Sequence, residues 1–479
     1  MKEINIPIEI KDEVTARFDN KVGKFSSNVL NEILNKVKKL NFTVEAKKYY
    51  KDSVQRKDKL VIVIKSLIKT IQNEKYGMFL RRDKIYLFNG EYWKTLDKSE
   101  LVAFLKHVAI KSGLNKLDCE YHKFKDDLFK QFISSDEISF LEKTQSKVKI
   151  NLQNGTFTFS KEKNYLADFS KNDFLTYQLP FIFDTSAKCP LFNQYLDRVL
   201  PEQESQNLLL EYVAYIFMKD MNLEKVLILF GDGANGKSVF FDIITNLLGR
   251  NNVSNFSISS LTDSKGHSRA EIENKLLNYS SEIGKQIDSD IFKQLASCEP
   301  VQAAIKYIQP FSIFDYARMI FNCNTLPSII EETKGFERRF LFIHFNQTIP
   351  EEEQDKNLAN KIINSELSGI FNLVIKAARR LRKNEGFTFS QDSIKLFEKF
   401  RKENDVLEIF LSENNFVKSI SKHMLVKTLF SQFKIFCNEG NFDQINKIEF
   451  GKKLKKRKFQ IDRSNKGLKV YIEKNSFII

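Results

Sequence analysis

One stretch of nine residues constrains this chain more than any other: Phe230-Gly231-Asp232-Gly233-Ala234-Asn235-Gly236-Lys237-Ser238. It has the spacing G-x-x-x-x-G-K-S. In such a loop the glycines allow a tight turn, and successive backbone N–H groups point at the phosphates of a nucleotide. Lys237 supplies a positive charge between the β- and γ-phosphates, and the Ser238 hydroxyl is a ligand for Mg²⁺. The residues from Gly231 to Ser238 are therefore expected to hold a nucleoside triphosphate, ATP, with Mg²⁺.

The flanks of this loop agree with that interpretation. Residues 226–230 (VLILF) form a continuous apolar run, which is typical of a buried parallel strand. Downstream, apolar residues recur at helical spacing over residues 240–248, and Gly249 stands where a helix C-cap belongs. The loop should thus join a strand to a helix N-terminus, where the helix dipole favours phosphate. The alternative is a glycine-rich turn that contains Lys-Ser by chance.

Composition limits the class of protein. The 479 residues are enough for about three domains. Lys and Arg number 76 against 61 Asp and Glu, and this net charge of +15 favours a polyanionic partner over a merely basic soluble protein. We see no signal peptide, and the apolar run at residues 60–64 is too short to span a membrane. Five scattered cysteines without a C-x-x-C predict neither zinc nor disulfides, so we expect a reduced, cytoplasmic protein.

The pattern predicts an α/β protein with four regions. Residues 1–80 are Lys-rich and helical, and residues 81–195 form an α+β domain with hairpin turns at Asn89-Gly90 and Asn154-Gly155. Residues 196–385 carry the phosphate loop, and residues 386–479 form a separate tail.

Three further strands are expected after the loop, and polar residues stand at their ends. A strand over residues 276–281 ends at Glu282, and an apolar strand over residues 314–322 is followed by Asn324. The pair Arg338-Arg339 precedes the last strand, residues 340–343. Each of these residues also has a plainer interpretation: a surface acid for Glu282, a turn for Asn324 and a structural ion pair for one of the arginines.

The tail contains a dense run of positive charge. On a helix over residues 450–459, Leu454 and Phe459 can face a core while several cations project to solvent: Lys452, Lys453, Lys455, Lys456, Arg457 and Lys458. A turn at residues 464–467 then leads into a strand. A basic helix followed by a two-stranded hairpin is a winged-helix signature, which predicts contact with DNA phosphates. The alternative is a solvated basic face without a partner.

Taken in order, these motifs resemble superfamily 3 helicases of the poxvirus, phage and plasmid primase-helicase type. The resemblance rests on the G-x-x-x-x-G-K-S loop, Ser281-Glu282, Asn324-x-x-Pro327 and Arg338-Arg339, and it covers about 400 of the 479 residues. No primase domain is recognisable before Asn89-Gly90. Asp288-Ser289-Asp290 has the D-x-D form of a primase metal site, but it lies inside the ATPase region and is interpreted as a solvated loop.

This resemblance implies a ring-forming AAA+ ATPase, usually a hexamer. It implies that Glu282 orients the attacking water and helps Ser238 to hold Mg²⁺, and that Asn324 senses the γ-phosphate. Arg338 or Arg339 would act as an arginine finger on the ATP of the neighbouring subunit.

In such helicases a hairpin between the second and third strands enters the channel of the ring. The matching segment here is residues 301–311, in which Lys306 is the cation and Tyr307 stands beside it. Lys306 is then expected to hold the nucleic-acid backbone. The alternative is a core hairpin with Lys306 directed to bulk water.

We therefore expect an ATP-dependent DNA helicase that replicates a phage, plasmid or other mobile element. Its expected partners are single-stranded and duplex DNA, other copies of the chain, and a separate primase or polymerase. The alternatives are a P-loop packaging motor or nucleotide kinase, and a non-enzymatic DNA-binding replication initiator.

Overall fold

The computed structural model describes residues 25, 28–73, 76–81, 84–138, 148–160, 164–284, 287–307, 309–324, 334–403, 405–440, 442 and 444–475. The chain forms two compact units, Met1–Gln178 and Leu179–Ile479. This division lies earlier than the predicted boundary at residue 195. The reason is that residues 182–187 are bound to the second unit: Asn372 donates to the Asp184 carbonyl at 2.8 Å, and Ser368 donates to the Ile182 carbonyl at 2.8 Å.

The first unit is a helical bundle beside a small sheet. Its helices are α2 (Asn28–Lys36), α3 (Phe42–Lys47), α4 (Arg56–Gln72), α5 (Lys98–Lys111), α6 (Lys116–Glu120) and α7 (His122–Ile133). Leu30, Ile64 and Phe104 from three of these helices share one core with Ile85 and Leu87 of the sheet. Residues before and after residue 80 thus share a single core, so the predicted division between residues 1–80 and residues 81–195 is wrong.

Two three-stranded antiparallel sheets complete this unit. Their strands are β1 (Gly77–Arg81), β2 (Lys84–Phe88), β3 (Trp93–Leu96), β4 (Val148–Leu152), β5 (Gly155–Phe159) and β6 (Tyr165–Ala167). The predicted turn at Asn89-Gly90 joins β2 to β3, and the Asn89 side chain accepts the Tyr92 N–H at 2.8 Å. The second turn lies one residue earlier than predicted, because Leu152 pairs with Gly155 and Gly155 already belongs to β5.

The second unit is built on a five-stranded parallel sheet with the order β13-β7-β12-β9-β8. The strands are β7 (Val226–Phe230), β8 (Val253–Ser254), β9 (Leu277–Ser280), β12 (Arg318–Cys323) and β13 (Phe340–His344). β7 pairs on both sides, and its residues are buried on both faces. The carboxyl ends of parallel strands meet at one edge, so the segments after β7, β9 and β12 come together there.

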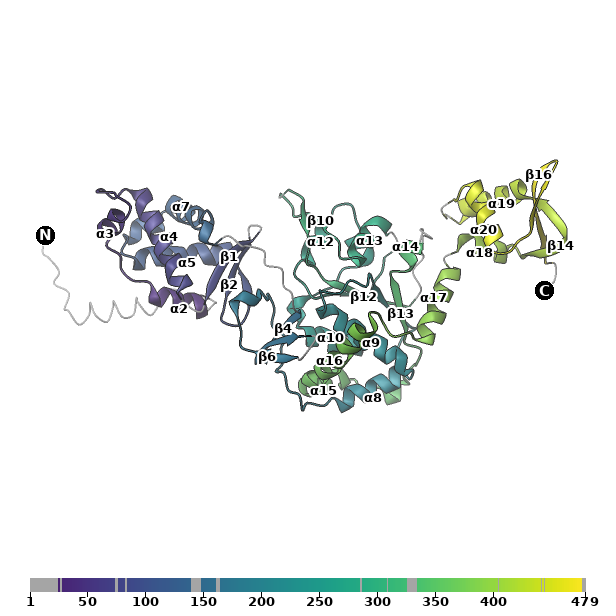
Figure 1. Cartoon of the computed structure of the whole chain (residues 1–479), viewed down its shortest axis with the longest axis horizontal. Helices are drawn as coiled ribbons and strands as arrows, with labels where there is room; N and C mark the ends of the chain where they lie inside the picture. Colours follow the sequence, from purple (N-terminus) through teal and green to yellow (C-terminus); the bar gives the residue numbers. More distant parts are fainter. Residues whose placement is uncertain are drawn as a thin grey trace. The chain divides into compact units, whose positions relative to one another are not determined.

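Helices cover both faces of this sheet. They are α8 (Pro190–Val199), α9 (Gln203–Phe217), α10 (Lys237–Leu248), α11 (Ile258–Leu261), α12 (His267–Glu271), α13 (Ser289–Ala296), α14 (Lys334–Glu337), α15 (Leu358–Ser365), α16 (Leu367–Asn384) and α17 (Gln391–Glu403). In Figure 1, α12 and α13 lie on one side of the sheet, and α9, α10 and α16 lie on the other. Among the described residues, no helix is long and apolar enough to cross a membrane.

The strand predicted over residues 314–322 begins later than expected, at Arg318 of β12. A separate antiparallel hairpin, β10 (Val301–Ala303) and β11 (Phe311–Ile313), precedes β12. Phe314 is exposed between β11 and β12, whereas Tyr316 turns inward and its hydroxyl donates to the Glu299 carbonyl at 2.8 Å. Residues 314–317 therefore connect the hairpin to β12, and only residues 318–322 of the predicted run form the strand.

The C-terminal part has its own hydrophobic core. Its elements are α18 (Val406–Glu413), β14 (Phe416–Leu425), α19 (Val426–Glu439), α20 (Lys447–Lys456), β15 (Ile461–Ser464) and β16 (Gly467–Lys474). The strands form an antiparallel sheet in the order β14-β16-β15. The predicted boundary at residue 385 is too early, because Leu396 and Phe400 of α17 belong to the core of the central sheet. The separate core begins with Leu407.

Candidate nucleotide site

The phosphate loop lies at the carboxyl edge of the central sheet. It leaves β7 after Phe230 and enters α10 at Lys237, and α10 ends before Gly249, as the sequence predicts. Gly236 is the N-cap of α10 and has a φ of 88°, a left-handed conformation that favours glycine. The loop is thus joined to the N-terminus of a twelve-residue helix, which carries a partial positive charge.

Lys237 is buried within this loop. Its ammonium group donates to the Gly231 carbonyl at 2.5 Å and to the Asn235 side-chain oxygen at 3.0 Å. Burial lowers the pKa of Lys237 from its ordinary value, while Asp232 opposes that shift. The loop therefore holds its positive charge in a fixed place, surrounded by neutral oxygen atoms.

Asn235 fastens the loop to a distant part of the chain. Its side-chain nitrogen donates to the Asp232 carbonyl at 2.5 Å and to the Phe345 carbonyl, just beyond β13, at 3.0 Å. A Cβ atom on Gly231 would lie 2.3 Å from the same Phe345 carbonyl. Gly231 is therefore required for close backbone approach, and Asn235 shapes the loop.

Helix α8 packs against the phosphate loop and supports it. The Tyr195 hydroxyl donates to the Gly236 carbonyl at 2.9 Å, and burial raises the pKa of that hydroxyl. A Cβ on Gly236 would lie 2.7 Å from the Val199 side chain. The spacing of the motif gives no signal that Tyr195 supports the loop.

A cavity of about 790 Å³ opens in front of the loop. This volume lies within the range of small-molecule sites, about 300–1,000 Å³. The predicted residues that line it are Gly233, Ala234, Asn235, Gly236, Lys237, Ser238 and Asn324. Ser281 of the Ser281-Glu282 motif also lines the cavity. Residues that the sequence analysis did not single out complete the wall: Leu191, Gln194, Tyr195, Arg198, Val239, Asn322, Ile349, Glu353, Gln354, Asp355, Lys356 and Leu358. The structure thus joins the loop to α8 and to the segment before α15.

The side chains at this edge suit Mg²⁺ held mainly through phosphate. Ser238 is exposed and lines the cavity, so its hydroxyl is available as an oxygen ligand. Ser281 lines the cavity after β9, whereas Glu282 is exposed one residue further on and its N–H donates to Ser280 Oγ at 3.2 Å. Within the described residues, no group of three His, Cys, Asp or Glu side chains could hold a metal. Asp288 of the D-x-D motif caps α13, and Asp290 is exposed.

Two asparagines of β12 and its end reach the same cavity. Asn324 lies just after β12, and Asn322 accepts a hydrogen bond from the Tyr279 hydroxyl at 3.0 Å. The rest of the Asn324-x-x-Pro327 motif lies outside the described residues.

Arg338 and Arg339 differ sharply in their surroundings. The Arg338 side chain is 64% exposed and pairs with Glu224 at 2.7 Å. The Arg339 side chain is only 10% exposed, and it donates to Ser297 Oγ at 2.9 Å. Neither arginine lines the cavity of its own subunit. Arg338 is thus the one of the two that is accessible to another molecule.

The candidate DNA-contacting residues are mostly exposed. Lys306 and Tyr307 lie in the turn between β10 and β11, and Tyr307 is fully exposed with a φ of 67°. Of the six predicted cations on α20 and just after it, Lys452, Lys455, Lys456 and Lys458 are exposed.

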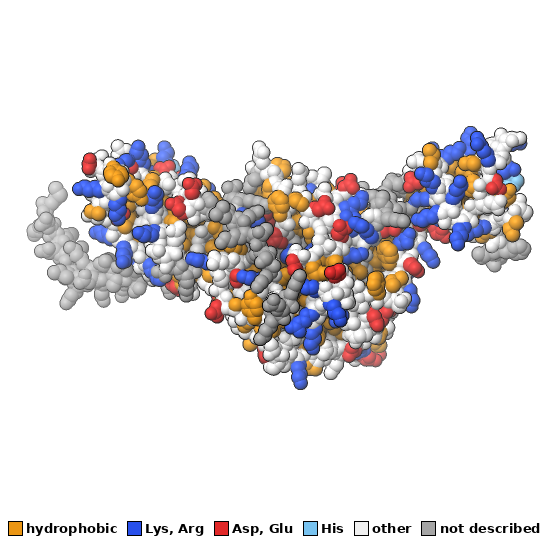
Figure 2. Space-filling model, in the orientation of Figure 1, with side chains coloured by type: hydrophobic (Ala, Val, Ile, Leu, Met, Phe, Trp, Pro, Cys, Tyr) orange, Lys and Arg blue, Asp and Glu red, His pale blue; other side chains and the backbone are white. Residues whose placement is uncertain are grey.

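Two other cations of the tail, Lys453 and Arg457, are only partly exposed. Burial lowers the pKa of Lys453, and Arg457 pairs with Asp405 and with Glu408, the latter at 3.1 Å. Leu454 and Phe459 are buried, as predicted. Figure 2 shows Lys and Arg side chains gathered on the C-terminal part of the chain.

Two family models match this chain. Residues 65–201 match the family described as "D5 N terminal like", a stretch that includes the region 81–195 predicted to be an α+β domain. Residues 229–339 match a family of unknown function, DUF5906. The second match begins in β7 and ends at Arg339, so it spans the phosphate loop, Glu282, Asn324 and both arginines.

Solved structures show a weaker likeness. One is titled "The A form apo structure of NrS-1 C terminal region-CTR"; it is 13% identical, with 85% of this chain and 98% of that chain covered and a TM-score of 0.45. A second structure of the same NrS-1 region, residues 305–718, is also 13% identical, covers 84% of this chain and 98% of that chain, and has a TM-score of 0.44.

Proposed function

We propose that this protein is an ATP-driven DNA helicase, a hexameric motor of the superfamily 3 type that serves DNA replication of a phage, plasmid or similar element. One observation carries the proposal. The G-x-x-x-x-G-K-S loop runs from a buried parallel strand into a helix N-terminus, and Ser238 and Asn324 reach one cavity with it. That arrangement suits a nucleoside triphosphate with Mg²⁺. The D5 N terminal like match supports the replication context.

Each role in ATP hydrolysis falls to a named residue. Lys237 neutralises phosphate charge, and Ser238 holds Mg²⁺. Glu282 orients the attacking water, and Asn324 contacts the γ-phosphate. Arg338 is the arginine finger, because its exposed side chain can reach a second copy of the chain while Arg339 is buried against Ser297.

The C-terminal part supplies duplex contact in this proposal. Its helices α18–α20 and its three-stranded sheet support the proposal that a winged helix follows an AAA+ motor. In this proposal, α20 presents Lys452, Lys455 and Lys456 to the phosphates of DNA. The cations add affinity without sequence specificity, since phosphate contacts are the same at every base pair.

The decisive experiment measures ATP hydrolysis with and without single-stranded DNA. The parent should hydrolyse ATP, and DNA should raise the rate. Glu282→Gln should still bind ATP but turn it over at least about tenfold more slowly, because the water loses its orienting group. Glu271→Gln removes another exposed carboxylate of the same unit and serves as the matched control. Hydrolysis by Glu282→Gln at the parent rate would refute the role of Glu282.

The same measurement separates the alternatives. A nucleotide kinase would transfer phosphate to a small acceptor and ignore DNA. A non-enzymatic initiator would bind DNA without hydrolysing ATP, and the intact Lys237 and Ser238 argue against it. A packaging motor would respond to duplex rather than to single-stranded DNA.

A further inference from the structure

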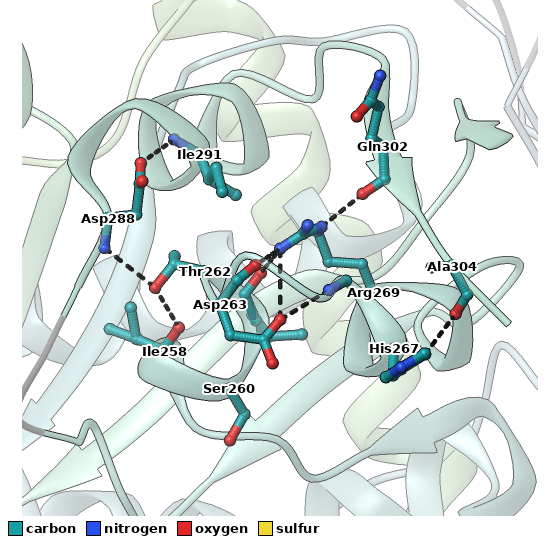
Figure 3. A network of polar contacts seen from close by, with 12 residues as sticks. Ile258, Ser260, Thr262, Asp263, His267, Arg269, Asp288, Ile291, Gln302 and Ala304 are labelled. Carbon is teal, nitrogen blue, oxygen red and sulfur yellow. Dashed lines mark hydrogen bonds and ion pairs between the residues drawn. The ribbon is translucent and has the colours of Figure 1, made fainter. Parts of the chain in front are cut away.

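A buried polar network lies between the central sheet and the β10–β11 hairpin (Figure 3). At its centre Arg269 is only 4% exposed. Its Nη1 atom donates to the Leu261 carbonyl at 2.8 Å and to the Asp263 carbonyl at 2.7 Å, and its Nε atom donates to the Gln302 carbonyl of β10 at 2.5 Å. One guanidinium thus joins two segments that are more than thirty residues apart in sequence.

Two further contacts fix the base of the hairpin to the same segment. The Ala304 N–H donates to the Gly266 carbonyl at 3.1 Å, and His267 Nδ1 lies 3.1 Å from the Ala304 carbonyl. Gly266 has a φ of 74°, and a Cβ there would lie 2.8 Å from Arg269 Nη2. The first strand of the hairpin is therefore anchored, while Lys306 in its turn is exposed.

The other end of this segment is bound to β9 and to the residues that follow it. Asn278 of β9 donates to the Phe256 carbonyl at 2.8 Å and accepts the Phe256 N–H at 2.9 Å. After β9, the Ile283 carbonyl accepts the Ser259 N–H at 3.1 Å. A Cβ on Gly284 would lie 2.0 Å from Ser259 Oγ, so the two segments approach closely.

Thr262 continues the connection. Its hydroxyl donates to the Ile258 carbonyl at 3.0 Å and accepts the Asp288 N–H at 3.2 Å. Residues 256–269, which we call the connector, are therefore hydrogen-bonded at one end to the β9 edge, next to Ser281 of the cavity, and at the other end to β10.

We propose that Arg269 is a positioning residue that makes the β10–β11 hairpin follow the nucleotide site through the connector. This inference rests on the proposed function, because it assigns a cause to hairpin movement in an ATP-driven motor. The planar guanidinium donates in three directions at once, whereas the single ammonium of a lysine cannot reproduce that fork. Without the Arg269 side chain, only the polar contacts at Ala304, among the described residues, join the connector to the hairpin, which then follows the loop after β9 less closely.

The first test needs no DNA activity. Hydrogen–deuterium exchange of β10 and β11 is measured with and without a non-hydrolysable ATP analogue and Mg²⁺. The analogue should change exchange of the hairpin in the parent and in Thr262→Ser, which keeps the hydroxyl. The change should be at least halved in Arg269→Lys and also in Thr262→Val, a variant that keeps the shape of threonine but loses both hydrogen bonds.

The second test separates positioning from simple loss of stability. Arg269→Lys should bind the analogue as the parent does and keep its ATP hydrolysis without DNA, but lose DNA stimulation and unwinding. The weaker single-strand binding of Lys306→Ala should not fall further when Arg269→Lys is added, because both act through the hairpin. A merely structural arginine would give additive losses and a lower analogue affinity.

Several outcomes overturn the inference. If the parent binds and hydrolyses ATP but Arg269→Lys keeps the exchange response and DNA stimulation, the inference fails and the proposed function stands. If the parent does not bind the analogue, both fail together. If Arg269→Lys does not fold, the comparison of Thr262→Val with Thr262→Ser decides: equal exchange responses in this pair refute the connector.

Discussion

The phosphate loop and the turn of the β10–β11 hairpin are built in opposite ways. In the loop, Asn235, Lys237 and Tyr195 all make hydrogen bonds that fix the backbone, and two of the three glycines are crowded by neighbouring atoms. In the hairpin turn, Lys306 and Tyr307 are exposed, and the contacts described lie at the base of the hairpin. The candidate nucleotide site is thus preformed, whereas the exposed turn can follow its base.

The largest effect is expected at Lys237. Lys237→Ala should reduce ATP hydrolysis to background, because the β- and γ-phosphates lose their fixed cation. Lys356→Ala removes a lysine that lines the same cavity, and its hydrolysis should stay within a few-fold of the parent. Equal losses in a steady-state phosphate-release assay would mean that the preformed loop is not the phosphate site.

Arg338 and Arg339 test whether a second copy completes the site. Arg338→Ala should slow hydrolysis by about 10³–10⁵-fold, as loss of an arginine finger does. Mixing it with Lys237→Ala should restore part of the activity, since some interfaces then combine an intact loop with an intact arginine.

Arg339→Ala provides the contrast, because that side chain is buried. It should lower stability by about 1–3 kcal/mol through loss of the hydrogen bond to Ser297, which thermal unfolding would detect. If mixtures of Arg338→Ala and Lys237→Ala stay inactive, Arg338 acts within its own subunit.

Lys306 tests the exposed turn. Lys306→Ala should abolish unwinding and DNA stimulation and weaken single-strand binding, while hydrolysis without DNA stays at the parent rate, because the grip rests on backbone charge. Lys306→Arg keeps the charge and should unwind. Unwinding by Lys306→Ala as fast as by the parent would show that the hairpin is structural.

Glycines within the loop offer a finer comparison. Gly236→Ala meets both a positive φ and the Val199 side chain, so we expect a loss of about 1–3 kcal/mol in stability, together with weaker ATP binding. Gly233→Ala has no neighbour within 4 Å of the added Cβ and should leave the unfolding temperature unchanged. Calorimetry with and without ATP measures both, and equal effects would contradict the crowding around Gly236.

The smallest effect concerns α20. Replacing Lys452 and Lys455 together by Gln should reduce the slope of log affinity for duplex DNA against log salt by about 2, because two fewer counterions are released. Arg457→Gln instead should loosen the C-terminal part, because its partners are Asp405 and Glu408. A salt slope that is unchanged after loss of both lysines would remove α20 from the DNA contacts.

Local patterns predicted well what local chemistry determines. The strand–loop–helix around Lys237, the turn after β2 and the burial of Leu454 and Phe459 all follow from short-range spacing, and they occur in the structure. The α20–β15–β16 order was also predicted from the tail.

Such local patterns did not predict how residues far apart in the sequence pack together. No local pattern near residue 80 shows that one core continues across that position. No local pattern near residue 386 shows that α17 packs on the central sheet. Tyr195 and Phe345 support the loop from 41 and 110 residues away. No local sequence pattern distinguishes Arg269, because only the folded chain brings the Gln302 carbonyl to it.

The hydrogen bond from Asn235 to the Phe345 carbonyl also has a consequence during synthesis. The two residues are 110 positions apart, and β7 pairs with β12 and β13, which are made later. At about 5–20 residues per second, the ribosome needs roughly 6–22 s to span that interval. A nascent chain therefore carries its complete loop motif for many seconds before Asn235 can reach its partner, and the loop cannot take its final shape until the last strand of the sheet has emerged.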